Sequence, residues 1–576
     1  MSWEVWIMRL KTSFCNGRVV WKNLTRFAPV WVLYSVAEVL GLMLTDTATY
    51  GRIAGDLNDI MGPVAIFHGF YALIVAACLF GDLFDSRLCN GLHAMPMRRS
   101  GWLLTNLVSG LVFALIPAIV GGAVGAVLLG NAWWMALLWQ GTSLLQFLFF
   151  FGLAVFSAMC AGKRMGMVAI YTILNFLSIL IYWIITMIYE PLLPGVVISD
   201  TWFVYLCPVV SIASDNYVNF NYNSVSGGFG SFNPEAWNYL FICTGVGVVL
   251  MLASWLLYRR RNLESAGDFV SFRPMRMFFL VFYTFVMGML LYSFGELFGL
   301  ERDYGFLVVG IMIGWFTGWM LLERTVKIFT GKVFLGFTIF VALFAGSIGL
   351  TIVDFAGIAS YVPETEKIET AVLYLGNDNY AYSYQQGYTE DGWWLTEQEE
   401  FTKMQDLHRK IMAQQDKNAG QTITVKLHYL LSNGSDVMRN YEVPADSAVA
   451  EELRVYFSDI RVVFGTDKLE LLKENIDSAH VYITGTGSYD GVELTDPQQI
   501  QSVLDAIEAD CQVGAMAQYS YFHKDQEYYG SIDLSFHEID SNQWGSIYRG
   551  EYVDIYRDCN NVIAALETLG VISVKS

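Results

Sequence analysis

One acidic residue stands inside an otherwise apolar stretch near the start of the chain. Glu38 lies within 28–45, a run with no other charged residue. A charge at the centre of a membrane helix costs about 2.5–3.5 kcal/mol on insertion scales, so such a group faces a cavity or a partner, or is protonated. We expect Glu38 to serve either in substrate or proton binding or in a structural hydrogen bond between helices. Gln146 and Asn175 are weaker cases, for which helix packing is the usual role.

A second candidate site is the polar loop 82–99, between two apolar runs. It combines two acids, an apolar ridge, a turn at a proline and a basic pair. These residues are Asp82, Asp85, Leu88, Leu92, Met95, Pro96, Arg98 and Arg99. A short amphipathic segment that ends at a proline suits a rigid contact for a cytoplasmic partner. The alternative is a plain topology anchor, for which the basic pair is sufficient.

The common catalytic and nucleotide-binding motifs are absent from the sequence. It contains no Gly-x-x-x-x-Gly-Lys-Ser/Thr loop, no His-Glu-x-x-His pair and no Gly-x-Ser-x-Gly elbow. We therefore expect no enzymatic activity, no metal and no cofactor. Cys511 and Cys559 are the only cysteines of the last 220 residues, and they form either a disulfide or two buried thiols.

The composition excludes several classes of protein. Hydrophobic residues make up 54% of the 576 residues and charged residues 15%, against roughly 25% charged in soluble domains, and the mean hydropathy is +0.41. A disordered protein, a nucleic-acid binder and a free cytosolic enzyme are thereby excluded, which leaves an integral membrane protein. Residues 1–356 hold 20 Lys+Arg and 18 Asp+Glu, a net of +2, whereas 357–576 hold 15 and 36, a net of −21. Nucleic acid and anionic lipid headgroups would repel this acidic tail.

Apolar runs of about 17–25 residues are long enough to cross a bilayer as helices. The sequence contains nine such runs, at 28–45, 61–81, 103–129, 137–161, 165–189, 236–258, 277–297, 306–322 and 333–353. One set of alternate loops holds 18 Lys and Arg, and the opposite set up to residue 356 holds two. Because basic residues stay on the cytoplasmic side, the N-terminus is expected inside and the acidic tail outside. The chain is thus expected to be a multi-pass protein of the cell membrane, in contact with the lipid bilayer.

The segment before the first run is basic and aromatic. Lys11, Arg18, Lys22 and Arg26 alternate there with apolar residues. This pattern is typical of an amphipathic helix lying on the inner membrane face. The alternative is that 1–27 is a short basic tail that only fixes topology.

Two parts of the acidic tail resemble each other at an offset of 99 residues. The segment 395–399 aligns with 494–498, and each precedes an amphipathic helical pattern that is followed by a candidate hairpin. We interpret the tail as an α+β domain built from two β-α-β-β-α repeats, at about 366–460 and 477–570. The alternative is a chance match within one α+β domain.

Several motifs around the first six runs carry a family resemblance. They are KNLTRFAPVW at 22–31, LHAMPMRR at 92–99, TNLVSGL at 105–111, YRRR at 258–261 and ESAGD at 264–268. On these residues the chain resembles ABC-2 type transporter permeases, specifically the Ytr-type permeases of Gram-positive bacteria that have a C-terminal extracytoplasmic domain.

The resemblance implies a division of the chain and a set of partners. Residues 28–258 would be the six-span core and 259–356 three further spans, followed by the outer domain at 357–576. Such permeases pair as homo- or heterodimers and are driven by two separate cytoplasmic ATPase subunits, onto which the loop 82–99 would dock. The expected function is transport of a small molecule, peptide or antibiotic. The alternative is a ligand sensor or mechanical transmitter in an ABC complex, through which nothing crosses the membrane.

Overall fold

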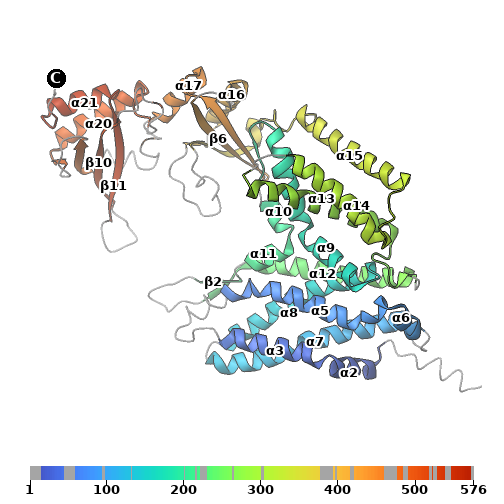
Figure 1. Cartoon of the computed structure of the whole chain (residues 1–576). Coiled ribbons are helices and arrows are strands. Elements are labelled where there is room, and N and C mark those ends of the chain that lie inside the picture. The colour runs from blue at the N-terminus through green and yellow to red at the C-terminus, as the bar shows by residue number, and fades with distance from the viewer. Residues whose placement is uncertain are drawn as a thin grey trace, which may run out of the picture. The chain divides into compact units, whose positions relative to one another are not determined.

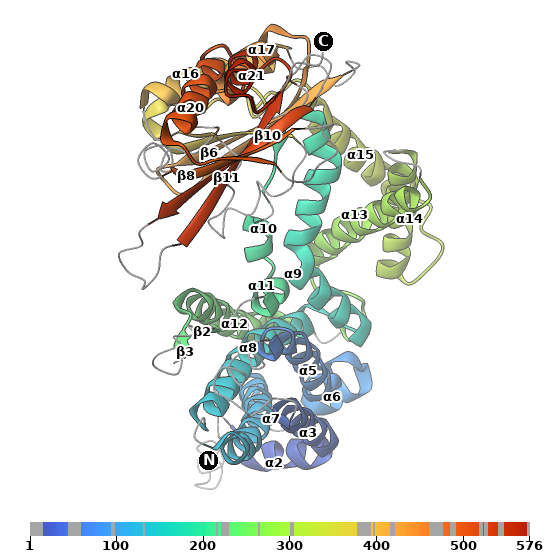
Figure 2. The same cartoon turned by 90° about the vertical axis from the view of Figure 1, so that its left-hand side faces the viewer.

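The computed structural model forms two compact units (Figures 1 and 2). Unit 1 comprises Met1–Met187 and Asp200–Gly346, and unit 2 comprises Ile188–Ser199 and Ser347–Ser576. The structure describes residues 15–43, 59–93, 98–130, 133–199, 201–214, 217–220, 230–262, 265–299, 304–376, 393–395, 398–414, 421–459, 463, 476–483, 491–517, 522, 528–538 and 547–572.

Unit 1 is helical. Its helices are α2 (Gly17–Arg26), α3 (Ala28–Met43), α5 (Val64–Leu79), α6 (Ser86–His93), α7 (Arg99–Leu128), α8 (Trp133–Cys160), α9 (Arg164–Ile184), α10 (Thr201–Tyr205), α11 (Pro208–Ser214), α12 (Pro234–Arg260), α13 (Arg273–Leu297), α14 (Tyr304–Glu323) and α15 (Gly331–Ile352), the last of which runs on into unit 2. Among the described residues, eight helices are long and apolar enough to cross a membrane. The bent pair α2–α3, with an angle of 67°, brings the number to nine if it counts as one span. The prediction of a polytopic helical membrane protein agrees with this architecture.

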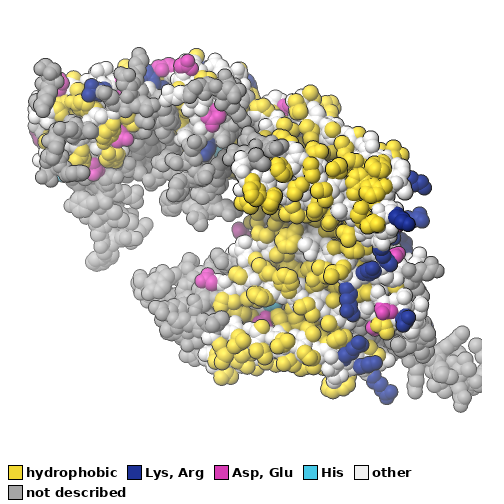
Figure 3. Space-filling view, viewed as in Figure 1, with side chains coloured by type: hydrophobic (Ala, Val, Ile, Leu, Met, Phe, Trp, Pro, Cys, Tyr) yellow, Lys and Arg dark blue, Asp and Glu magenta, His cyan; other side chains and the backbone are white. Residues whose placement is uncertain are grey.

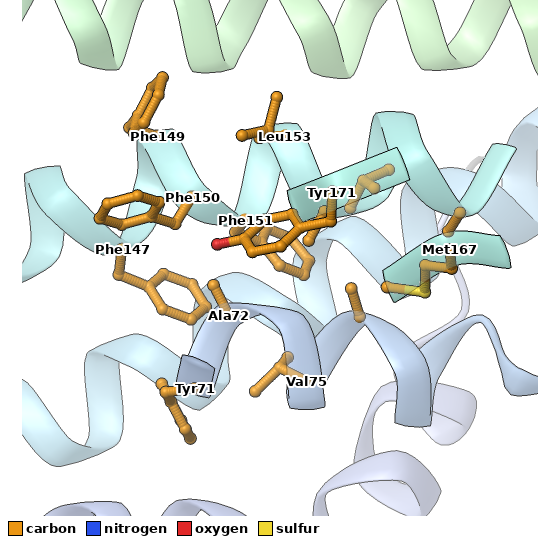
Figure 4. Close-up of a cluster of buried hydrophobic side chains, with 14 of the residues drawn as sticks. Tyr71, Ala72, Val75, Phe147, Phe149, Phe150, Phe151, Leu153, Met167 and Tyr171 are labelled. Atoms are coloured by element: carbon orange, nitrogen blue, oxygen red, sulfur yellow. The ribbon is translucent and has the colours of Figure 1, made fainter. Parts of the chain in front are cut away.

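The core of unit 1 is centred on α8. Its aromatic side chains, among them Phe147, Phe150 and Phe151, lie between α5 and α9 (Figure 4). On its other side α8 crosses α12 where Gly152 meets Gly247, and a Cβ on Gly152 would overlap the Gly247 carbonyl. Small residues allow such close helix contact in membrane proteins, where van der Waals packing replaces the hydrophobic effect between helices.

Unit 2 contains two antiparallel sheets, and unit 1 a small hairpin of β2 (Val218–Phe220) and β3 (Gly230–Phe232). The first sheet has the order β1-β7-β6-β4-β5, and the second has the order β11-β10-β8-β9. The strands are β1 (Val196–Val197), β4 (Ile368–Leu375), β5 (Trp393–Leu395), β6 (Thr422–Leu431), β7 (Asp436–Pro444), β8 (Ile476–Ile483), β9 (Val492–Leu494), β10 (Tyr528–Glu538) and β11 (Ile547–Tyr556).

Two helices pack on one face of each sheet. They are α16 (Gln398–Gln414) and α17 (Ala448–Phe457) on the first, and α20 (Pro497–Gln512) and α21 (Asn560–Thr568) on the second (Figure 2). The C-terminal region is therefore α+β, as the sequence predicts. In detail the order differs, because each helical segment is preceded by a short second strand, β5 or β9. The helix α20 also begins later than its pattern indicated, with Asp496 rather than Thr495 as its N-cap.

Candidate functional site

The carboxylate of Glu38 lies at the centre of a buried polar cluster in unit 1. Glu38 is 4% exposed, and four side chains approach the two carboxylate oxygens. Tyr34 donates its hydroxyl to Oε1 at 2.7 Å, and Nε2 of His68 lies 3.1 Å from the same oxygen. Trp139 and Gln140 donate to Oε2 at 2.7 and 3.2 Å. A carboxylate without such partners would be unstable in an apolar interior.

Three helices supply these groups. Tyr34 precedes Glu38 by one helical turn on α3, so both side chains share one face. His68 comes from α5, and Trp139 and Gln140 come from α8. The helix α7 contributes space, because a Cβ on Gly121 would lie only 2.7 Å from Nε2 of Gln140.

The polar contacts continue beyond His68. Its Nδ1 lies 2.6 Å from Oε1 of Gln146, whose Nε2 donates at 3.4 Å to the Met61 carbonyl and to the Tyr217 hydroxyl. Tyr217 in turn donates to the Ile212 carbonyl at 3.0 Å. A continuous chain of hydrogen bonds thus joins α3 to the segment that follows α11.

The sequence indicated Glu38 and, as a weaker case, Gln146, and it missed the other partners of Glu38. The structure places Glu38 in hydrogen bonds that join α3 to α5 and α8, and its role in substrate or proton binding stays a prediction. His68 was overlooked, although it is the only histidine inside any of the nine apolar runs. That signal was available, because an ionisable residue in a membrane helix is by default a functional candidate. Asn175 lies apart from the cluster and donates to the Tyr171 carbonyl at 2.8 Å.

The loop 82–99 begins as a short helical knob. Residues Gly81–Phe84 form a 3₁₀ turn, η1, and α6 follows. The Asp85 carboxylate accepts the backbone N–H groups of Arg87 and Leu88 at 2.8 and 3.3 Å, and thereby caps α6. Leu88 is 53% exposed, so α6 presents an apolar residue on its surface.

The other predicted residues of the loop are only partly described. Leu92 belongs to α6, but its side chain lies outside the description, and Met95 and Pro96 lie outside the described residues. Asp82 is half-buried in η1, and Arg98 precedes the first residue of α7. Arg99 donates from Nη1 to the Arg261 carbonyl at 3.2 Å.

Arg261 anchors this knob to the rest of unit 1. It is buried, and its Nη1 donates to the carbonyls of Ala158 and Met159, in the last turn of α8, at 2.9 and 3.2 Å. Its Nη2 donates to the Leu83 carbonyl of η1 at 3.2 Å. A guanidinium is favoured at a helix C-terminus because it offers several donors to free carbonyls and complements the helix dipole.

The helix α2 lies at the same end of unit 1 as α6. Asn23 of α2 donates to Asn106 and Ser109, in the first turns of α7, at 3.0 and 3.1 Å. Lys and Arg side chains gather at this end, and apolar side chains cover the flanks of the helices (Figure 3). The expected amphipathic helix is present at Gly17–Arg26, and residues 1–14 lie outside the described part of the chain.

Unit 2 contains a strand that comes from between two helices of unit 1. After α9 the chain forms one turn of π-helix at Ile185–Tyr189 and then β1, whose Val196 pairs with Arg439 of β7. Just before β1, Gly195 has a φ of +73°, and a Cβ there would overlap the Tyr441 ring. Its carbonyl accepts the N–H of Asn440 at 2.8 Å.

A buried histidine contacts Tyr441, the residue whose ring lies against Gly195. His408 of α16 has its ring nitrogens 3.1 Å from the Tyr429 hydroxyl and 2.9 Å from the Tyr441 hydroxyl. Burial, with the Arg439 charge as a second cause, lowers the pKa of His408 to about 3. Arg439 itself donates to the carbonyls of Ile358 and Tyr361 at 2.9 and 3.1 Å.

The two cysteines of unit 2 are separate thiols. Cys559 donates its Sγ–H to the Ala515 carbonyl at 3.2 Å, and Cys511 is also buried and free. Burial raises the pKa of both thiols to about 12. Neither thiol is therefore activated as a nucleophile.

Known proteins add no further constraint on the site. Comparison of the chain with protein-family models, with curated proteins and with solved structures gives no match. In the part of the chain that the structure describes, no group of three or more His, Cys, Asp or Glu residues is placed to hold a metal ion.

Proposed function

We propose that the chain is the permease subunit of an ABC-2 type transporter and that separate ATPase subunits drive it. The observation that carries this proposal is the knob formed by η1 and α6. Arg261 ties the knob to the last turn of α8, while Leu88 stays exposed. A small, rigid, partly apolar projection at the basic end of a helical body suits the transfer of force from another protein.

The proposed orientation follows the charges. The end that carries α2, α6 and the Lys and Arg side chains faces the cytoplasm, where the ATPase subunits bind. Residues 28–258 form the six-span core, 259–356 add three spans, and the acidic domain at 357–576 is extracellular. A second permease subunit, either the same chain or another, completes the pathway for a small molecule, peptide or antibiotic.

We also propose that the extracellular domain arose by duplication. The order β5-β4-β6-β7 in the first sheet corresponds to β9-β8-β10-β11 in the second. The registers correspond as well, because Ala371 pairs with Leu395 and Tyr429, while Ala479 pairs with Leu494 and Leu534. Shared strand order and shared register support two related units better than a chance match does.

The strand β1 favours a second candidate function. Because β1 follows α9 without a long linker and pairs within the first sheet, a change in that sheet can pull on α9. This arrangement suits a ligand sensor or mechanical transmitter in an ABC complex. Transport by vesicles that contain the chain and its ATPase would support the permease, whereas ligand-stimulated ATP hydrolysis without transport would support the sensor.

Substitution on α6 tests the leading proposal. We expect the Leu88→Asp variant to insert into the membrane normally. At least tenfold less ATPase should co-purify with it, because truncating an interface anchor costs about 2 kcal/mol or more. Arg98→Gln, outside α6, is the matched control and should retain the ATPase. Normal co-purification and normal ATP hydrolysis with both Leu88→Asp and Leu92→Asp would refute the assignment of α6.

A further inference from the structure

We infer that Glu38 and His68 form a proton-binding site, in which one proton is held as an imidazolium–carboxylate pair that docks α3 onto α5 and α8. The inference does not rest on the permease assignment. It rests on the donors and acceptors that surround the two side chains, which are only 4% and 1% exposed.

The charge of Glu38 follows from the number of donors that face it. The hydroxyl of Tyr34, the indole N–H of Trp139 and the amide of Gln140 donate to the carboxylate, and Nε2 of His68 makes the fourth approach. A protonated carboxyl would carry its proton on Oε1, the oxygen that faces Nε2, and would then have to accept the Tyr34 hydroxyl on its O–H oxygen, a weaker acceptor than a carboxylate oxygen. An ionised carboxylate, which only accepts, fits the four contacts.

The charge of His68 follows from the orientation of Gln146. The Tyr217 hydroxyl donates to the Ile212 carbonyl and accepts from Gln146, and the Met61 carbonyl accepts from Gln146 as well. The Gln146 amide nitrogen therefore points toward these two groups, and its carbonyl oxygen points at Nδ1 of His68, 2.6 Å away.

Both ring nitrogens of His68 then face acceptors. Nδ1 faces the Gln146 carbonyl and Nε2 faces the Glu38 carboxylate. A neutral imidazole carries only one N–H, so it fits both contacts only if Glu38 carries the proton and donates it to Nε2. The three other donors that face the Glu38 carboxylate disfavour that arrangement. The doubly protonated ring satisfies both contacts, and the buried pair is neutral as a whole.

Among the described residues, the remaining groups around the pair carry no compensating charge. On α3 and α5 they are the hydroxyls of Tyr34 and Tyr71, whose rings stack at 3.8 Å, and Tyr71 donates to the Phe113 carbonyl. On α8 they are Trp139, Gln140 and Gln146, and α7 offers Gly121. The Tyr217 hydroxyl is the next polar group beyond Gln146. The proton on His68 is thus the counterion of Glu38.

Helix movement and proton binding are linked by this arrangement. Loss of the proton from His68 to water leaves neutral imidazole and an uncompensated carboxylate, and an unpaired buried charge strongly destabilises the docked state. Conversely, withdrawal of α3 removes the carboxylate that holds the proton. The site lies five residues before the end of α3 at Met43, in the half of the helices remote from α2 and α6. We therefore place proton exchange on the side of unit 1 opposite the knob.

Nitrogen NMR of the full-length chain in lipid nanodiscs, labelled with ¹⁵N-histidine, tests the charge state directly. The chain has seven histidines, and His68→Gln identifies the relevant signals. We expect both His68 nitrogens to resonate as imidazolium at pH 7.5, and Glu38→Gln to convert them to a neutral tautomer. Tyr34→Phe, which removes one donor but no charge, should leave the imidazolium. A neutral His68 in the unsubstituted protein would overturn the inference.

A double-substitution cycle provides a second readout. Glu38→Gln and His68→Gln should each lower the melting temperature, and the double substitution should lower it by less than the sum of the two. Additive shifts would also overturn the inference, because an ion pair couples the two side chains energetically.

Discussion

The two sheets of unit 2 share a strand order but differ at one edge and on one face. The first sheet gains β1 beside β7, whereas in the described part of the chain the second sheet ends at β11. On the face away from the helices, Lys426 and His428 of the first sheet are buried, whereas Tyr482 and Tyr552 of the second are 38% and 59% exposed. Similar topology thus serves two purposes: the first sheet is tied to the chain between α9 and α10, and the second presents an aromatic surface.

The largest expected effect comes from a substitution of Gly195, the residue just before β1 in the first sheet. Gly195→Ala combines a positive φ, worth about 1–2 kcal/mol for a residue with a side chain, with an overlap on Tyr441 that adds about 1–3 kcal/mol. We expect amide hydrogen exchange to show that β7 is destabilised by about 3 kcal/mol. Gly570→Ala is the matched control, because its φ is +70° and nothing lies within 4 Å. Equal effects of the two changes would show that β1 is not held by this close contact.

A pH dependence should distinguish the first sheet. The pKa of His408 is about 3 in the folded protein against 6.5 for the ordinary group. The unfolded chain therefore binds more protons below pH 6.5, and the stability that neutral His408 provides is lost as the pH falls from 6.5 toward 3. By pH 4.5 the loss is about 3 kcal/mol. Hydrogen exchange in β6 and β7 should show this slope, and His408→Gln should abolish it; an unchanged slope in the variant would assign it to other groups.

Helix capping gives a smaller contrast between the sheets. The buried Asp510 carboxylate accepts N–H groups from Asn561 and Val562 and so caps α21 from another helix, whereas Ser447 caps its own helix α17. We expect Asp510→Ala to destabilise α21 by about 2 kcal/mol and Ser447→Ala to destabilise α17 by about 1 kcal/mol. Hydrogen exchange of the two helices measures both. The reverse order would mean that Asp510 adds nothing beyond an ordinary cap.

The smallest expected effect concerns thiol reactivity. Both cysteines of residues 357–576 lie in the part of the chain that forms the second sheet and its helices. Because burial raises the pKa of Cys511 and Cys559 to about 12, we expect negligible alkylation in the folded chain and full alkylation after denaturation. Peptide mass spectrometry after labelling measures this. A disulfide-linked peptide pair would contradict the free thiols.

The sequence predicted those parts of the fold that depend on long patterns. Each of the nine apolar runs coincides with a helix, because a run of about 20 apolar residues has few other solutions. Strands β5 and β9, of three residues each, and β1, of two, are too short for any periodicity to indicate. Their existence depends on pairing with distant strands. The assignment of β1 to the first sheet was therefore beyond sequence reasoning.

In the candidate site, too, the sequence indicated what depends on a local pattern and missed what depends on distant contacts. Glu38 was detectable because a single charge in an apolar run is unusual. Its partners Trp139 and Gln140 were not, because indole and amide groups are common in membrane helices and only the packing of α3 on α8 selects these two. Arg261 was visible within a basic cluster, but its role depends on carbonyls from residues more than a hundred positions earlier in the chain.

The contact between Arg261 and Leu83 has a consequence for biosynthesis. The two residues are 178 positions apart, and the guanidinium that fixes η1 leaves the ribosome only after α12 has been made. A nascent chain that ends earlier has the α6 sequence but lacks its anchor. The surface around α6 therefore matures late, after the sixth apolar run has been inserted, and a truncated chain would not present that surface in its final form.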